Sequence, residues 1–175
     1  MPVSGCYSHF KMQYISQNAR FSSCNRYRYS LERSWDEGKG RVLFIGLNPS
    51  TADHRRDDPT IRRCVGFAKS WGYQSMEIVN LFAFRATYPK DLKAALEPIG
   101  KQNDSWIRNA EKRSDLTIVC WGSINMGRSR AADVIKNLKF PHCLKINRTL
   151  EPAHPLYMKA NLKPSPYMAP QNAGQ

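Results

Sequence analysis

Short apolar runs alternate along this chain with longer segments in which apolar residues recur at helical spacing. The runs have the length and composition of buried strands and cover residues 42–45, 76–82, 116–121 and 143–146. The first helical segment begins at Pro59 and ends at Gly72. Two more cover residues 105–112 and 126–138. This alternation predicts an α/β fold: a three-layer α/β/α sandwich around a mainly parallel four-stranded central sheet.

A different pattern precedes the first apolar run. Arg26 and Arg28 alternate with Tyr27, Tyr29 and Leu31. This period of two predicts an edge strand, with aromatic residues toward the core and arginines toward solvent. The alternative is a surface whose aromatic residues stack on bases and whose arginines neutralise phosphates.

The pattern divides the chain into three parts. Residues 1–40 form a lead-in whose strand or strands pack on the main domain, and residues 41–163 form the α/β domain. Residues 164–175 hold three prolines and a polar end, which predicts an extended or disordered tail.

Polar side chains follow each apolar run. Because the carboxyl ends of parallel strands meet at one edge of a sheet, these side chains should converge there. The expected group, with the turn residue Gly122, consists of Asn48, Ser50, Asn80, Arg85, Ser123 and His154.

The convergent residues suit the recognition of a base. An amide at Asn48 can hold a water but is too weak a base to deprotonate it, and Asn80 offers a donor and an acceptor to a nucleobase edge. His154 can donate to a developing anion or accept a proton. The structural alternatives are that the amides satisfy loop backbone, that Ser50 caps a helix and that His154 packs in the core.

The net charge of +13 is the strongest compositional signal. Residues 101–150 hold ten Lys or Arg against four Asp or Glu, which favours a polyanionic partner such as DNA or another nucleic acid. The phosphate contacts we expect are Arg85, Ser123, Arg128 and Arg130.

No apolar run approaches the ~20 residues of a membrane span, and the N-terminus lacks a secretory signal. We therefore expect a cytoplasmic protein without a membrane partner. The spacing of the five cysteines indicates neither a disulfide framework nor a zinc site, with Cys6, Cys24 and His9 as a weak exception.

Several other chemistries lack their motifs. The sequence contains no GxGxxG, GxxxxGK[ST] or GxSxG loop. Asp53, His54, Asp57 and Asp58 leave a metal-dependent nuclease as a minor alternative to helix capping and loop solvation.

Six ordered motifs carry a resemblance to known families. They are LNPSTAD, DDPTIRRC, FAKSWGY, NLFAFRAT, PIGKQND and HPLY. Over residues 20–167 they resemble a bacterial and phage family catalogued as a domain of unknown function. More distantly, their order resembles the uracil-DNA glycosylase superfamily, which implies a parallel sheet flanked by helices.

The glycosylase resemblance implies a role for several residues. Gly46-Leu47-Asn48-Pro49 is similar to the first motif of the mismatch-specific thymine/uracil branch, so Asn48 would position the hydrolytic water. Asn80 would read the base, and His154 would stabilise charge on the leaving base. The departures are Asn48 in place of a carboxylate, the lack of an aromatic after Pro49, and the lack of a cysteine quartet for an iron–sulfur cluster.

The sequence thus predicts a DNA-binding, glycosylase-like protein that flips a base into a pocket and, if catalytic, hydrolyses its N-glycosidic bond. Ser50 and Phe82 would contact the base, with Phe84 as the alternative to Phe82 for stacking. No metal or other cofactor is expected. The alternatives are a non-catalytic nucleic-acid or nucleotide binding module on the same fold, and a phage or defence factor that binds a protein partner.

Overall fold

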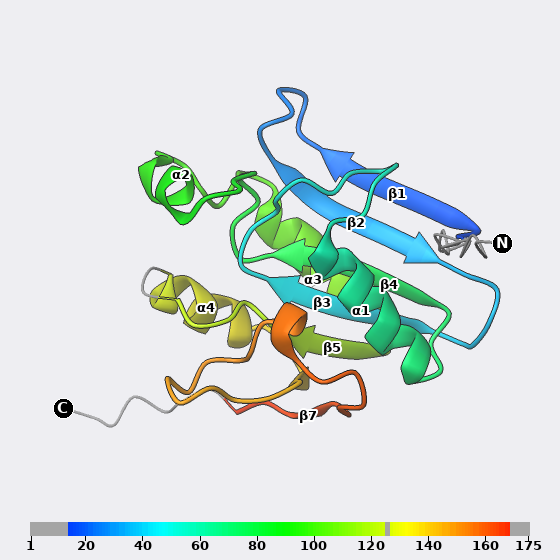
Figure 1. Ribbon diagram of the computed structural model, residues 1–175. Helices are drawn as coiled ribbons and strands as arrows, with labels where there is room; N and C mark the ends of the chain where they lie inside the picture. The colour runs from blue at the N-terminus through cyan, green and yellow to red at the C-terminus, as the bar shows by residue number, and fades with distance from the viewer. Residues whose placement is uncertain (1–13, 125–126, 169–175) are drawn as a thin grey trace, which may run out of the picture.

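The protein is built around one mixed β-sheet. The computed structural model describes residues 14–124 and 127–168, and within them the sheet has seven strands in the order β1-β2-β4-β3-β5-β6-β7 (Figure 1). The strands are Ser16–Phe21 (β1), Arg28–Ser34 (β2), Arg41–Gly46 (β3), Ser75–Asn80 (β4), Leu116–Val119 (β5), Pro141–Cys143 (β6) and Ser165–Pro166 (β7).

The α/β class is confirmed, but a four-stranded, mainly parallel sheet is wrong. Strands β4, β3, β5 and β6 are parallel to one another, whereas β1, β2 and β7 add antiparallel pairings at the two edges. The described pairings are thus three parallel and three antiparallel. The difference arises because the lead-in adds the β1–β2 hairpin beside β4 and the proline-rich tail adds β7 beside β6.

Residues 164–168 belong to the predicted tail, yet they dock on the sheet. β7 pairs with β6, and the Tyr167 side chain is 5% exposed. The Tyr167 hydroxyl donates to the Leu150 carbonyl at 3.2 Å. Residues 169–175 lie outside the described part of the chain.

Helices cover both faces of the sheet. They are Pro59–Ser70 (α1), Pro89–Ala94 (α2), Asn103–Lys112 (α3), Arg128–Ile135 (α4) and the 3-10 turn Pro155–Tyr157 (η1). The helix expected at Pro59 begins there because Asp58 caps it, accepting from the Ile61 amide at 2.9 Å. Within the described residues, no helix has the length and apolar character needed to cross a membrane.

Alternate residues of β3 enter two separate cores. Val42 and Phe44 pack with α1, which crosses the near face of the sheet in Figure 1. Leu43 and Ile45 pack on the other face, with residues of α3 and α4. The arrangement therefore has three layers, and both faces of the central strands are apolar, as parallel strands require.

Strand β2 is an inner strand, so our expectation of an edge strand is wrong. A β-bulge lies in it, because Arg20 opposes Ser30 while Phe21 opposes Arg28, leaving Tyr29 without a partner residue in the register. Tyr29 stacks on Trp106 of α3, with ring centroids 6.2 Å apart. Arg28 is instead turned to the α1 side and is 2% exposed, not solvated as we predicted.

Candidate active site at the carboxyl ends of the central strands

A cavity of about 200 Å³ lies where β3, β4 and β5 end. Its lining includes four of the predicted site residues, namely Asn48, Ser50, Asn80 and His154. It also includes residues that we did not place in the convergent group, among them Arg28, Asp58, Thr60, Cys120 and Trp121. The convergence expected from the parallel strands is therefore present for the core of the site.

The amide of Asn48 is held in one orientation. Its Nδ2 donates to the carbonyl oxygens of Pro49 at 3.0 Å and Ala86 at 2.7 Å. Two carbonyl acceptors require the nitrogen at this position, which leaves Oδ1 as the atom available to a ligand or a water. Asn48 thus offers an acceptor to the cavity and also joins two loops.

The carboxamide of Asn80 is buried without a partner. Its side chain is 3% exposed, and Oδ1 has no hydrogen-bond partner in the described residues. A Cβ at Gly46 would come within 2.8 Å of Asn80 Nδ2, so glycine leaves the room that this amide occupies. The first residue of α3 holds the end of β4, because Asn103 Nδ2 donates to the Asn80 carbonyl at 2.9 Å. A buried, unpaired amide that lines a cavity is poised for a ligand.

His154 is oriented by the turn that it starts. Its Nδ1 accepts from the Leu156 amide at 3.3 Å, so the neutral ring carries its proton on Nε2. Burial lowers the pKa of His154, and the nearby Asp58 carboxylate opposes this shift. Arg63 of α1 holds the turn by donating to the carbonyls of Pro155 and Met158. The cavity is thus lined by a neutral imidazole with an N–H to donate.

Arg28 and Asp58 bring opposite charges to the same cavity. Arg28 Nη1 donates to the Ala52 carbonyl at 2.9 Å, whereas its buried Nε has no partner within the described ranges. Burial lowers the pKa of Arg28 to about 10. Asp58 uses Oδ1 to cap α1. Sequence reasoning missed Arg28 because the bulge that turns it inward leaves no sign in the period-two pattern.

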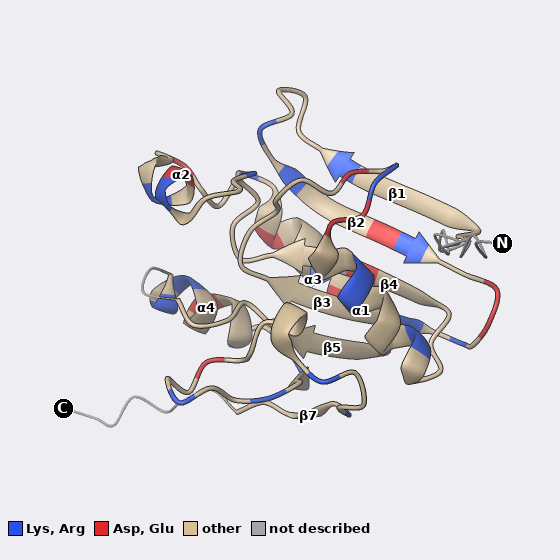
Figure 2. Cartoon of the chain, in the orientation of Figure 1, with Lys and Arg blue, Asp and Glu red and all other residues tan. Residues whose placement is uncertain are grey.

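A second, wider cavity of about 520 Å³ adjoins the first and shares Ser50, Ala86 and Thr87 with it. The rest of its lining is mostly polar or basic and consists of Asn25, Arg26, Thr51, Asp53, Arg56, Phe84 and Arg85. Figure 2 shows basic residues on the β1–β2 hairpin and on the loop that leads to α1. The first cavity therefore has a neighbour with a basic lining.

Arg85 lies in this second cavity, as expected for a residue near the site. Its guanidinium sits 5.0 Å from the centre of the Phe21 ring, and Nη1 donates to the Asn25 carbonyl at 3.2 Å. Phe84, the alternative stacking residue, also lines this cavity.

The remaining predicted site residues lie elsewhere. Phe82 is 4% exposed in the core beneath α3 and α4 and lines a different hollow. Ser123 bonds to Thr149 and Asn147 side chains on the surface. Arg128 pairs with Glu151 at 3.4 Å. Arg130 is 9% exposed and donates to the Leu81 carbonyl at 2.9 Å and to the Asp104 carboxylate at 2.6 Å.

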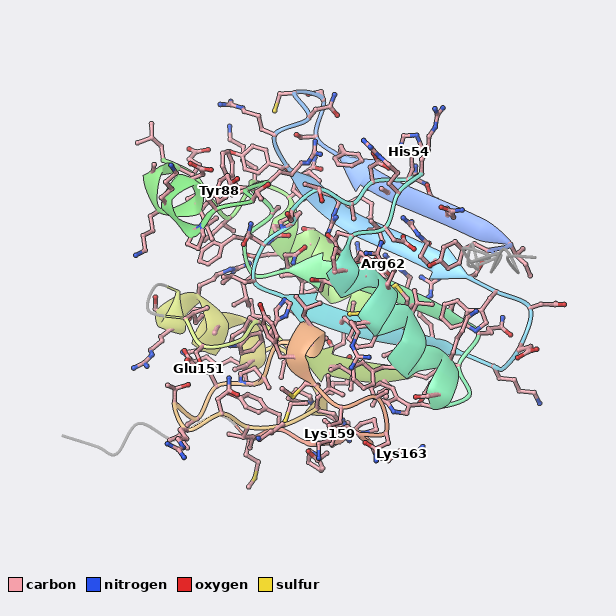
Figure 3. All side chains as sticks on the ribbon, viewed as in Figure 1. His54, Arg62, Tyr88, Glu151, Lys159 and Lys163 are labelled. Atoms are coloured by element: carbon pink, nitrogen blue, oxygen red, sulfur yellow. The ribbon has the colours of Figure 1, made fainter. Side chains whose placement is uncertain are left out.

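The acidic residues before α1 have structural partners. Asp53 accepts from the amides of Arg55 and Arg56, while Asp57 pairs with Arg33 at 2.9 Å. His54 is exposed on the outer side of this loop (Figure 3). In the described residues no three His, Cys, Asp or Glu side chains group closely enough to hold a metal ion. Cys6 and His9 lie outside those residues, and Cys24 is exposed.

Comparison with known proteins identifies the domain. No curated protein and no solved structure matches the chain. The model of one family, described as "Protein of unknown function (DUF1643)", matches residues 28–156. The match runs from the start of β2 into η1 and so contains Asn48, Asn80 and His154. The chain therefore belongs to this family of proteins of unknown function.

Proposed function

We propose that the cavity receives a nucleobase turned out of DNA and that the protein hydrolyses its N-glycosidic bond, in the manner of the uracil-DNA glycosylases that its motifs resemble. One observation carries the proposal. Asn48 follows β3, Asn80 ends β4 and His154 precedes η1, yet the three line one small cavity, each with a polar atom uncommitted to the fold.

The size and polarity of the cavity support a single ring as its occupant. Its 200 Å³ lies below the about 300–1,000 Å³ of sites for larger ligands. The Asn80 carboxamide presents a donor and an acceptor side by side, which is the pattern that reads a base edge. Ile61, Ile78 and Trp121 supply apolar walls for the faces of a ring.

The uncommitted atoms can be assigned to a hydrolysis. Asn48 Oδ1 would accept a hydrogen bond from the attacking water, and the second oxygen of Asp58 would take the proton that the water loses. Water oxygen attacks C1′, the C1′–N bond breaks, and the bonding electrons move onto the base. His154 would donate from Nε2 to the base oxygen where this charge develops.

The basic lining of the second cavity fits a flipped nucleotide. Extruding a base costs a few kcal/mol of unstacking, which contacts to the distorted phosphate backbone must offset. Arg26 and Arg56 are exposed in the second cavity, next to the proposed base site. They replace Arg128 and Arg130 as the phosphate contacts that we would test first.

A non-catalytic binding module on the same fold is the second candidate. Asn48 favours it, because this position would carry a carboxylate in the most active glycosylase branch. Base release decides between the two candidates, since both bind DNA but only the enzyme forms a free base.

The test is to incubate the protein with DNA that contains uracil, mismatched thymine or modified pyrimidines and to measure free base by mass spectrometry. We expect release of one base, loss of release in Asn48→Ala with DNA binding retained, and a rate lowered by orders of magnitude in His154→Ala. DNA binding without release of any base would reject catalysis.

A further inference from the structure

Arg28 is the charged group of the cavity that the proposed hydrolysis does not use. Its side chain is 2% exposed and lines the cavity beside Asn80 and Asp58. Only Nη1 makes a hydrogen bond, to the Ala52 carbonyl, and the buried Nε has no partner in the part of the chain that the structure describes. A guanidinium carries five N–H donors, so most of the donors of this buried cation remain unused.

Within residues 14–124 and 127–168, no carboxylate forms an ion pair with Arg28. Among the described residues, the ion pairs involve other arginines and lysines, and Arg28 is in none of them. Asp58 and Asp53 act on its charge from farther away, while Arg85 and Arg33 oppose them. An unpaired buried charge is costly, and the fold tolerates it here beside an open cavity.

Arg33 shows how the same strand compensates a buried arginine that serves structure. It is 1% exposed, pairs with Asp57 at 2.9 Å, and donates to the carbonyls of Glu32 at 2.8 Å and Asp53 at 2.5 Å. Arg28 lies on the other side of the bulge at Tyr29, which turns it toward the cavity. Bulges of this kind often re-aim a side chain at a functional site.

We propose that Arg28 binds an anionic oxygen group, a carboxylate or a phosphate, of the molecule that occupies this cavity. This inference rests on the cavity being the ligand site proposed above. The planar fork of arginine matches both groups with two parallel hydrogen bonds. The ligand class is therefore a heterocycle that Asn80 reads and that carries, on the ring or on its sugar, an ionised group facing Arg28.

Isothermal titration with four probes tests the proposal. The probes are uracil, its 6-carboxylate orotate, 2′-deoxyuridine 5′-monophosphate and inorganic phosphate. We expect one of the two anionic pyrimidines to bind about ten- to a hundredfold tighter than uracil. Preference for orotate assigns a ring carboxylate, whereas preference for the nucleotide, with competition by phosphate, assigns a phosphate.

The decisive variant is Arg28→Met, which should remove the difference in affinity (the gap) between the anionic pyrimidines and uracil. Arg108→Met, which removes an exposed charge from α3 on the other face of the sheet, should leave the gap intact. Arg28→Lys keeps the charge without the fork and should retain part of the preference, so the proposal stays testable if the Met variant folds poorly.

Equal binding of all pyrimidines, a gap that persists in Arg28→Met, or no binding of any probe would overturn this inference. The base-release experiment tests the proposed hydrolysis independently of this titration. Release of a base without an anion preference would overturn the role of Arg28 alone, and an anion preference without release would overturn the excision alone.

Discussion

At the scale of single residues, Asn48 does two things at once. Its Nδ2 ties the loop after β3 to the carbonyl of Ala86, and its Oδ1 remains for the cavity. A carboxylate could not do the first, because it has no donor for either carbonyl. The loop geometry thus explains why asparagine, and not aspartate, occupies this position.

This account predicts that Asn48→Asp is destabilising although it hardly changes the shape of the side chain. The variant loses two hydrogen bonds and places a negative charge against the Ala86 carbonyl, so we expect a loss of roughly 1–3 kcal/mol in the free energy of unfolding. Urea denaturation measures it. The control is Asn109→Asp on the exposed side of α3, which should change stability by less than about 0.5 kcal/mol. Equal effects at both sites would contradict this role of Asn48.

His154 predicts a pH dependence of stability. Because burial lowers its pKa below the ordinary value of 6.5, the unfolded chain binds a proton at this residue more readily than the folded chain does. The stability that His154 contributes is therefore complete above pH 6.5 and is lost as the pH falls through the lowered pKa. Urea titrations between pH 5 and 8 should show that the free energy of unfolding falls less with decreasing pH in His154→Gln than in the wild type. Equal losses in the wild type and in His154→Gln would contradict this role of His154.

At the scale of elements, strand β2 carries two buried arginines with opposite surroundings. Arg33 is paired with Asp57 and fixes the loop before α1, whereas Arg28 has no ion pair among the described residues. Removing one partner of a buried pair leaves the other charge uncompensated, but removing an unpaired charge leaves no such defect. The two residues therefore separate a structural role from a ligand-binding role.

We predict that Arg33→Met destabilises the protein by about 3–5 kcal/mol, because Asp57 and three carbonyls lose their donor. Arg28→Met should leave the stability of the ligand-free protein nearly unchanged or raise it. Thermal and urea unfolding of both variants compare the two. If Arg28→Met were the more damaging change, Arg28 would be a structural residue.

The elements that sequence reasoning found correctly have local causes. Asp58 and Pro59 start α1 by capping and by the fixed φ of proline, and the apolar run before Gly46 is a buried strand. The inward turn of Arg28 depends on a bulge opposite Arg20 in the neighbouring strand, and β7 depends on pairing with β6. The residue pattern of a single segment shows neither pairing. The shared cavity of Asn48, Asn80 and His154 was predictable because the loops after parallel strands converge. The inward turn of Arg28 and the burial of Phe82 in the core were not predictable.

At the scale of the whole molecule, the basic residues are divided between structure and surface. Arg33, Arg63 and Arg130 use their donors within the fold. Arg26 and Arg56 remain exposed beside the second cavity, so the charge next to the proposed base site is available to a polyanion. The net charge of +13 alone could not distinguish these groups.

We predict that Arg26→Gln with Arg56→Gln weakens DNA binding and reduces the slope of log K against log salt by about 2, because each phosphate contact contributes about 0.9. Affinities measured at several salt concentrations give the slope. The control is Arg108→Gln with Lys112→Gln on α3, which removes the same charge from the other face of the sheet. An equal change of slope in the control would remove the second cavity from the DNA footprint.

The most direct test of the central claim compares base release by the wild type, Gly46→Ala and Gly66→Ala. A Cβ at Gly46 would reach within 2.8 Å of Asn80 Nδ2 and displace the carboxamide that we propose reads the base. A Cβ at Gly66 on α1 meets nothing within 4 Å. The account predicts that the wild type and Gly66→Ala release the same base and that Gly46→Ala, though folded, does not. Equal release by all three, or by none, would contradict it.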